Sequence, residues 1–278
     1  MNEHLKHDEW RHALPLSMAG ISLANNNKKA EQAGMRGFRA IAIGVLITCA
    51  AQAQAEFSGT VMMATDYVFR GISNTDGDPA IQGSFDYGHD SGFYAGIWAS
   101  NVKFRENADV DAIETVQEAS VEIDYYAGLA SELDNGLSWE FGAQLVTYPG
   151  AEEALNYDYW EALLALGYSF DQLALEPELI GQAYFSPDYF GNSGDATYLS
   201  GLVYLHLPAD FGLNLSIGRQ TFEEDASLDY TDTKIGITKA LAGFEFELAY
   251  TDTNIPKEDC DGLDICSGRV VLSIARPM

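Results

Sequence analysis

Apolar and polar side chains alternate along most of the chain from Phe57 onward, and a period of two residues is typical of strands with two different faces. In the first stretch, one face carries apolar side chains such as Phe57 and Val61, and the other carries small or polar ones such as Ser58. Later stretches place charged residues such as Glu122 and Asp124 in the middle of the second face. The pattern predicts an all-β protein whose strands separate an apolar side from a polar side.

Twelve such stretches follow one another, and the spacing between them indicates the architecture. They are expected to start near these residues: Phe57, Ala80, Phe93, Ala119, Gly136, Tyr157, Gln172, Ala196, Phe211, Thr231, Phe244 and Gly268. The connections after even-numbered stretches are short, whereas those after odd-numbered stretches are longer and acidic. Outer-membrane barrels have this alternation, because every second turn lies on the periplasmic side and the others face outward.

The length of the strands and the needs of the backbone in lipid favour the same architecture. A bilayer-spanning strand takes about 9 to 11 residues, and residues 56–278 are sufficient for twelve strands with these connections. In hydrocarbon every backbone polar group must be paired internally, so the sheet must close. We therefore predict a closed antiparallel up-and-down transmembrane β-barrel of about 12 strands. A two-sheet sandwich is the alternative, but it gives no reason for the turns to alternate in length.

Aromatic residues lie near both ends of the predicted strands. Those at the long-loop ends are Tyr67, Phe69, Tyr148, Tyr159, Trp160, Phe185 and Tyr189, and those at the short-turn ends are Tyr168, Phe170, Phe211 and Phe244. Transmembrane barrels carry girdles of aromatic side chains at the two lipid interfaces. We expect these residues to form two such girdles.

Residues 35–55 precede the first strand and have the layout of a secretory signal peptide. Arg36 and Arg39 form a basic end, a hydrophobic run of about a dozen residues follows, and Ala53-Gln54-Ala55 provides a small-x-small cleavage site. The run is shorter than the roughly 20 residues of a spanning helix. We expect cleavage after Ala55 and residence of the exported part in the bacterial outer membrane.

The segment before Met35 needs a separate interpretation. Residues 1–34 have no sustained apolar period, and we interpret them as an upstream extension from a start codon assigned too early, with Met35 as the true start. The alternative is an unusually long basic leader. Lipidation at Cys49 is a further alternative, which the preceding Thr48 disfavours.

Charge and chemistry narrow the function classes. The chain has 15 basic and 42 acidic residues, of which 9 basic and 38 acidic lie after Ala55. Nucleic acid is not an expected partner, because phosphate binding needs a basic footprint. The exported part contains only His89 and His206 and no Gly-x-Ser-x-Gly motif, so we predict no enzymatic activity and no cofactor.

Two cysteines and two acidic clusters lie in the predicted outer loops. An even cysteine count in an exported chain favours a disulfide, here between Cys260 and Cys266. The acidic clusters are residues 223–225 and the acids around the cysteines, Glu258, Asp259, Asp261 and Asp264. Their oxygens suit Ca²⁺ or Mg²⁺, but the spacing matches no complete calcium loop. We interpret them as solvated acidic surface and predict no metal site.

Two segments resemble a known family. Residues 64–73, ATDYVFRGIS, and residues 92–102, GFYAGIWASNV, resemble the TorF family of porins, also known as the Gcw_chp family of uncharacterised bacterial proteins. The loop from Cys260 to Cys266 and residues 268–275, GRVVLSIA, are similar to the family's C-terminal end. The resemblance implies an outer-membrane barrel with a transport role. The chain departs from the usual barrel pattern at Met278, because such barrels usually end in an aromatic residue.

If the apolar face meets lipid, the polar face lines the interior. The expected pore-lining residues are Asp66, Arg70, Asp86, Glu122, Asp124, Glu140, Glu161, Glu176, Glu178, Glu245 and Glu247. Carboxylates in a pore favour cations over anions, so we predict a passive channel for small polar solutes or cations. The alternative is a closed barrel, in which these groups pair for stability and the outer loops have a structural, adhesive or partner-binding role. Arg70 either lines the pore or pairs with Asp66.

Overall fold

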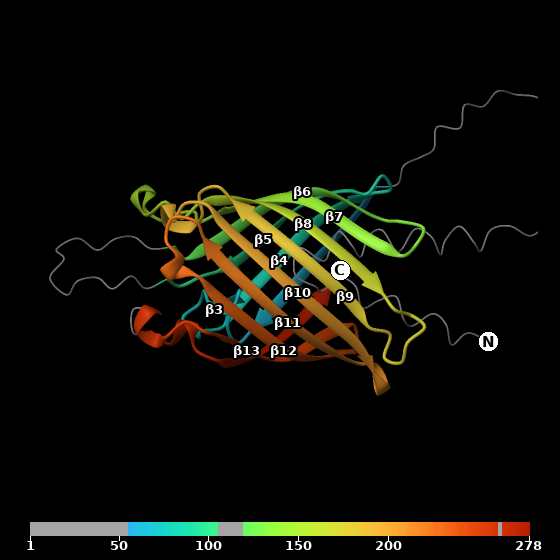
Figure 1. Cartoon of the computed structure of the whole chain (residues 1–278). Helices are drawn as coiled ribbons and strands as arrows, with labels where there is room; N and C mark the ends of the chain where they lie inside the picture. The colour runs from blue at the N-terminus through green and yellow to red at the C-terminus, as the bar shows by residue number, and fades with distance from the viewer. Residues whose placement is uncertain (1–54, 105–118, 261–262) are drawn as a thin grey trace, which may run out of the picture.

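Twelve antiparallel strands close into one barrel (Figure 1), as the computed structural model shows for residues 55–104, 119–260 and 263–278, the residues that it describes. The barrel strands are β1 (Ala55–Ala64), β4 (Ala80–His89), β5 (Phe93–Asn101), β6 (Val121–Glu132), β7 (Leu137–Thr147), β8 (Tyr159–Ser169), β9 (Glu178–Ser186), β10 (Ala196–Leu207), β11 (Phe211–Phe222), β12 (Tyr230–Leu241), β13 (Phe244–Thr253) and β14 (Arg269–Pro277). Each pairs with its neighbours in the chain, and β1 closes the ring between β4 and β14. The predicted closed barrel of 12 strands is confirmed.

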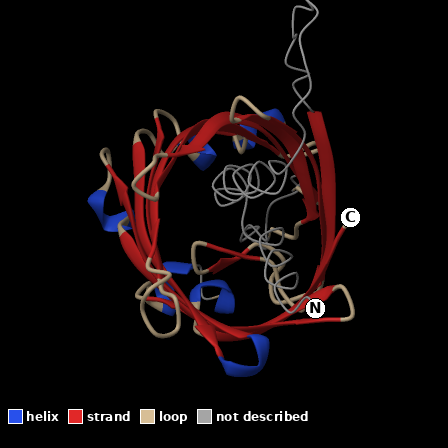
Figure 2. Cartoon of the chain, turned by 90° about the vertical axis from the view of Figure 1, so that its right-hand side faces the viewer, coloured by secondary structure: helices blue, strands red, loops and turns tan. Residues whose placement is uncertain are grey.

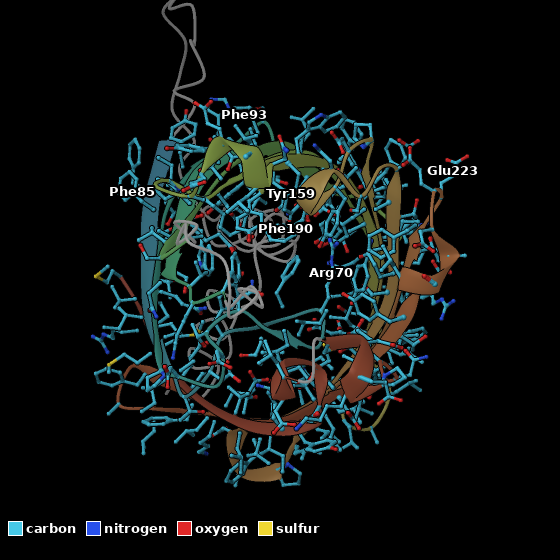
Figure 3. The ribbon with its side chains drawn as sticks, turned by 90° about the vertical axis from the view of Figure 1, so that its left-hand side faces the viewer. Arg70, Phe85, Phe93, Tyr159, Phe190 and Glu223 are labelled. Atoms are coloured by element: carbon cyan, nitrogen blue, oxygen red, sulfur yellow. A yellow bond between two sulfur atoms is a disulfide. The ribbon has the colours of Figure 1, made fainter. Side chains whose placement is uncertain are left out.

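The alternation of side chains places apolar groups outside and polar groups inside. Phe57, Met63 and Phe85 are each more than 60% exposed, whereas Asp124 and Glu140 are 4% and 0% exposed. Figure 3 shows Phe85 on the outside of the ring. So wide a band of exposed apolar side chains is rare on proteins in water and matches the hydrocarbon of a bilayer.

The connections at one end of the barrel are mostly longer than those at the other. The long ones are residues 65–79, 102–120, 148–158, 187–195, 223–229 and 254–268, and the short ones are residues 90–92, 133–136, 170–177, 208–210 and 242–243. The described connections include short 3-10 turns: η2 (Glu153–Leu155), η3 (Phe190–Asn192), η4 (Pro208–Asp210), η5 (Ala226–Leu228), η6 (Lys257–Cys260) and η7 (Asp264–Cys266). None of the helices in the described ranges is long and apolar enough to cross a membrane.

The connection between β8 and β9 differs from the prediction. It runs over residues 170–177, so β9 begins at Glu178 instead of near Gln172. Leu175 and Glu176 have φ angles of 68° and 40°, in the left-handed region that a strand does not use. The alternating leucines in this stretch therefore belong to a turn, and the assignment of Glu176 to the inner face of a strand was wrong.

The first long connection folds into the barrel. Within it, β2 (Val68–Phe69) and β3 (Ile72–Ser73) form a two-stranded hairpin, which lies inside the ring of barrel strands (Figure 2). Arg70 and Gly71 form its two-residue turn, with φ angles of 47° and 82°. A β-carbon on Gly71 would come within 2.9 Å of Cβ of Asp232 on β12. Glycine is therefore required by the turn and by the close approach of the hairpin to the opposite wall.

The inward hairpin also changes the predicted outer girdle of aromatic residues. Tyr67 follows the end of β1, and Tyr148 and Tyr159 point inward; all three are buried. Figure 3 shows Tyr159 and Phe190 inside the ring. Only Trp160 and Phe185 of that predicted girdle are clearly exposed, at 47% and 43%. Adjacent residues on a strand face opposite sides, so Tyr159 and Trp160 cannot both meet lipid.

The loop after β13 carries the two cysteines. The sulfur atoms of Cys260 and Cys266 are at bonding distance, 1.90 Å, as predicted. Lys257 donates to Asp264 at 2.6 Å, and this hydrogen bond and charge lower the pKa of the Asp264 carboxyl. Asp261 lies outside the described residues, as do residues 1–54 with the predicted signal peptide except Ala55.

Candidate functional site

The inner wall formed by β4 to β8 is acidic. Its inward carboxylates come from four of these strands: Asp86, Glu122, Asp124, Glu132, Glu140 and Glu161. The five strands contain no lysine or arginine. We call this inner surface of β4 to β8 the acidic wall.

Tyrosines that lie along the barrel interior hold several of these acids. The Tyr94 hydroxyl donates to Glu140, and its ring crosses Gly128, where an added β-carbon would come within 2.6 Å of the tyrosine Cζ. The Tyr126 hydroxyl likewise donates to Asp86. A neutral hydroxyl satisfies a carboxylate without removing its charge. The glycines therefore let tyrosines lie flat on the wall, where their hydroxyls satisfy the acids as neutral donors.

The Arg70 guanidinium, at the tip of the hairpin, is the one cation within the described residues that pairs with the acidic wall. Its two terminal nitrogens bond the two carboxylate oxygens of Glu161 at 2.9 and 2.8 Å. Nη1 also donates to Gln220 on β11 at 3.0 Å, and the guanidinium lies 4.2 Å from the ring centroid of Tyr198. Figure 3 shows Arg70 within the ring of strands. A planar guanidinium suits this bidentate and stacked arrangement better than an ammonium does.

Asp66 does not pair with Arg70, so that sequence alternative was wrong. Its carboxylate accepts from Ser73 and Thr75 of the same connection, at 2.6 and 2.8 Å. Arg269 of β14 donates to it at 2.7 Å. Asp66 therefore ties the base of the hairpin to the last strand, while Arg70 ties its tip to β8.

A third contact joins the hairpin to β6. The Tyr67 hydroxyl donates to Oε1 of Glu122 at 2.7 Å, and Asn74 lies 3.5 Å from the other carboxylate oxygen. The connection is thus held at β6, β8, β11 and β14 at once. It occupies part of the interior near the long-loop end (Figure 2), where Arg70 lies beside the acids of the wall.

The inner surface of β9 to β14, which we call the mixed wall, carries both signs of charge. Lys234 lies 2.9 Å from Oε1 of Glu247, which also accepts from Asn214 at 2.7 Å. Asp232 accepts from Tyr198 at 3.0 Å. Glu245 points inward and is half-buried on β13.

Two predicted residues lie toward the short-turn end. Glu178 is the first residue of β9 and lies 3.5 Å from Nε2 of His206. Glu176 is exposed in the turn before it. Ten of the eleven predicted pore-lining residues thus lie in the barrel interior or on the inward hairpin, and Glu176 does not.

The chemistry of the described residues adds no other kind of site. Nδ1 of His89 lies 2.7 Å from Oγ of Ser91, but this contact belongs to the tight turn between β4 and β5 on the surface. No group of three or more His, Cys, Asp or Glu side chains has the geometry of a metal site within the described ranges.

One protein family matches the sequence over most of its length. Its description is "Bacterial protein of unknown function (Gcw_chp)", and the match covers residues 48–273. The chain belongs to the Gcw_chp family. Comparison with curated proteins gives no match.

Solved structures show the same fold as this Gcw_chp protein. The KdgM porin has a TM-score of 0.51 at 7% identity, with 79% of this chain and 98% of that chain covered. The NanC porin also has a TM-score of 0.51, at 10% identity, with 78% of this chain and 97% of that chain covered. At these identities the likeness extends to the fold alone.

Several residues that shape the interior of this Gcw_chp barrel escaped the sequence analysis. They are Tyr94, Tyr126, Gln220 and Asp232, which bond the predicted residues or line the same space. Their signal in the sequence is the position of each on the inward face of its strand. For the tyrosines, a second signal is an inward glycine on the neighbouring strand.

Proposed function

We propose that this protein is a porin-like channel of the bacterial outer membrane that passes small polar solutes and prefers cations. The porin role that the TorF resemblance implies is part of this proposal. The apolar exterior, the closed barrel and the predicted signal peptide support the location. The observation that carries the proposal is the acidic wall, whose inward carboxylates have Arg70 as their one paired cation among the described residues.

The inward hairpin supports a selective channel in preference to a wide one. It crosses the interior with Arg70 and leaves the remaining carboxylates of the acidic wall bonded mostly to neutral donors. Charged rings near a constriction favour ions of opposite sign and exclude those of like sign. A solute that passes beside Asp86, Glu122 and Asp124 therefore meets a negative potential.

The experiment is single-channel recording of the purified protein in a planar bilayer under a salt gradient. Discrete conductance steps with a reversal potential on the cation side are expected. Heat-dependent mobility on a gel serves as the control for a folded barrel. The double change E122Q/D124N should move the reversal potential toward zero, whereas the same change outside the barrel, at Glu223 and Asp225, should not.

A second function has one observation in its favour. An aromatic cluster of Tyr148, Tyr157 and Phe190 lies inside the long-loop end, with the rings of Tyr157 and Phe190 stacked at 4.4 Å. Such packing suits a closed barrel that works through its outer loops. Folded protein that gives no conductance at any voltage would reject the channel and leave this alternative.

A further inference from the structure

Two neighbouring acids of the acidic wall have no cationic partner among the described residues. Glu122 and Asp124 are two residues apart on β6 and point to the same side, so their backbones lie about 7 Å apart. Arg70 lies at the hairpin tip and Arg269 at the start of β14, but Arg70 is paired with Glu161 and Arg269 with Asp66. Among the described residues, the hydrogen-bond partners of Glu122 are neutral: Tyr67, Asn74 and Tyr148.

Of these two acids, Asp124 is the one with an unsatisfied carboxylate oxygen. Its side chain is 4% exposed, and no described residue hydrogen-bonds to its Oδ1 atom. An unsatisfied carboxylate oxygen away from bulk water is costly, and a second negative charge beside it adds to the cost. The position therefore favours a bound species that brings both a positive charge and a hydrogen-bond donor.

Aromatic rings adjoin the same position. Trp98 on β5 is directly opposite Asp124 in the strand register, which places the two side chains about 5 Å apart at Cβ. The ring of Tyr67 packs against Trp98, with centroids 5.3 Å apart. A carboxylate beside aromatic faces is the combination that stabilises an organic ammonium ion, through an ion pair and a cation–π contact.

An inorganic divalent ion suits this place less well. Ca²⁺ and Mg²⁺ take about six or more oxygen ligands, and no group of three acidic, His or Cys side chains in the described part of the chain has metal-binding geometry. An alkylammonium ion needs only one or two carboxylates for its N–H groups, and its carbon atoms can lie against the rings.

We propose that Asp124, with Glu122, Trp98 and Tyr67 around it, binds a small organic ammonium ion in the barrel interior. The proposal deepens the proposed function, on which it rests, because it names the class of cation that the channel would pass. Asp124 accepts the ammonium N–H groups, Glu122 adds negative potential, and Trp98 faces the alkyl chain.

The test is isothermal titration calorimetry on protein expressed as the full chain and purified from membranes. The probe is n-butylammonium chloride, and n-butanol and MgCl₂ are the comparison compounds. D124N removes the charged acceptor of the ammonium N–H groups, so it should weaken butylammonium binding about tenfold or more. The variant W98L should weaken butylammonium binding without changing the response to MgCl₂.

The matched control is D232N, because Asp232 is also an inward aspartate near the long-loop end of its strand, on the mixed wall. It should leave butylammonium binding unchanged, and D124E, which keeps the charge, should retain most of it. The proposal would be overturned if D124N bound butylammonium as tightly as the unchanged protein does, provided that heat-dependent gel mobility shows the variant to be folded. So would butanol or MgCl₂ binding as tightly as butylammonium.

Calorimetry tests the ammonium site and bilayer recording tests the channel, so either hypothesis can be rejected without the other. Butylammonium binding by a barrel that conducts no ions would support the site and reject the channel. Steady cation conductance with no heat of butylammonium binding would support the channel and reject the site. If the protein both conducts ions and binds butylammonium, butylammonium should reduce the potassium current through the unchanged protein. It should have less effect on the current through D124N.

Discussion

The acidic wall and the mixed wall satisfy their inward carboxylates in different ways. Each places carboxylates inside a barrel, yet β4 to β8 contain no lysine or arginine. On the mixed wall, Lys234 pairs with Glu247 on the neighbouring strand, and Arg269 pairs with Asp66. The acidic wall relies on tyrosine and amide donors and on one cation that arrives from the loop after β1.

The difference lies in the kind of donor that satisfies each carboxylate. A salt bridge within the wall neutralises both partners, whereas a tyrosine hydroxyl satisfies a carboxylate and leaves its charge in place. The acidic wall therefore satisfies its carboxylates mostly with neutral donors, and the mixed wall pairs several of its carboxylates with cations. The lateral asymmetry of the interior follows from which residues donate, more than from how many acids each wall has.

The largest effect is expected from R70M, which removes the one cation among the described residues that pairs with the acidic wall. Glu161 would stay buried without its partner, and breaking such a pair costs about 3–5 kcal/mol. The free energy of unfolding, measured by urea titration in lipid vesicles, should fall by that amount. Without these contacts the hairpin should also move away from β8 and β11 and open the barrel interior. Single-channel conductance should therefore rise.

The matched change R219M tests whether any arginine would do. Arg219 points outward and pairs with Asp229, and its side chain is 47% exposed, so its loss should cost about 1 kcal/mol or less. Equal losses for R70M and R219M would contradict the anchoring role of Arg70.

A smaller effect is expected from Y94F, which removes one neutral donor from the acidic wall. Glu140 would keep no hydrogen bond from Tyr94, and an unsatisfied buried acceptor costs about 1–3 kcal/mol. The same urea titration measures the loss. Y250F is the control, because Tyr250 points outward and bonds Asp252 at 3.2 Å; it should change the stability little. A loss in Y250F as large as in Y94F would show that the hydroxyl on the wall has no special role.

The smallest effect on stability is expected from K234M on the mixed wall. The Lys234 and Glu247 side chains are 36% and 24% exposed, and ion pairs that water reaches contribute about 0–1 kcal/mol. Its effect on selectivity should be clearer, because Glu247 would regain an unpaired charge. The reversal potential should move further to the cation side, and a shift toward anions would contradict the neutralised state of this wall.

Most of the barrel could be predicted from the sequence because its signal is repeated on every strand. The observed starts of eleven of the twelve strands lie within two residues of the predicted ones. The exception, β9, follows a stretch in which Leu173 and Leu175 continue the alternation although the backbone has turned. A period of two describes side chains and does not detect left-handed φ angles such as that of Leu175.

The interior contacts were harder to predict, because they join strands far apart in the sequence. Parity along β6 and β8 correctly pointed Glu122, Asp124 and Glu161 inward. The partner of Arg70 depended on how the connection after β1 folds. The sequence suggested Asp66 as that partner because it is close in the chain. The pairing of inward tyrosines with glycines on adjacent strands requires the register, which one sequence does not supply.

The contacts of the first hairpin also constrain the order of assembly. Arg70 bonds Gln220, which is 150 residues later, and Asp66 bonds Arg269, which is 203 residues later. Neither bond can form until β11 and β14 have joined the sheet. Seating of the hairpin is therefore a late event in biogenesis, and a spectroscopic probe on it would report closure of the ring of strands.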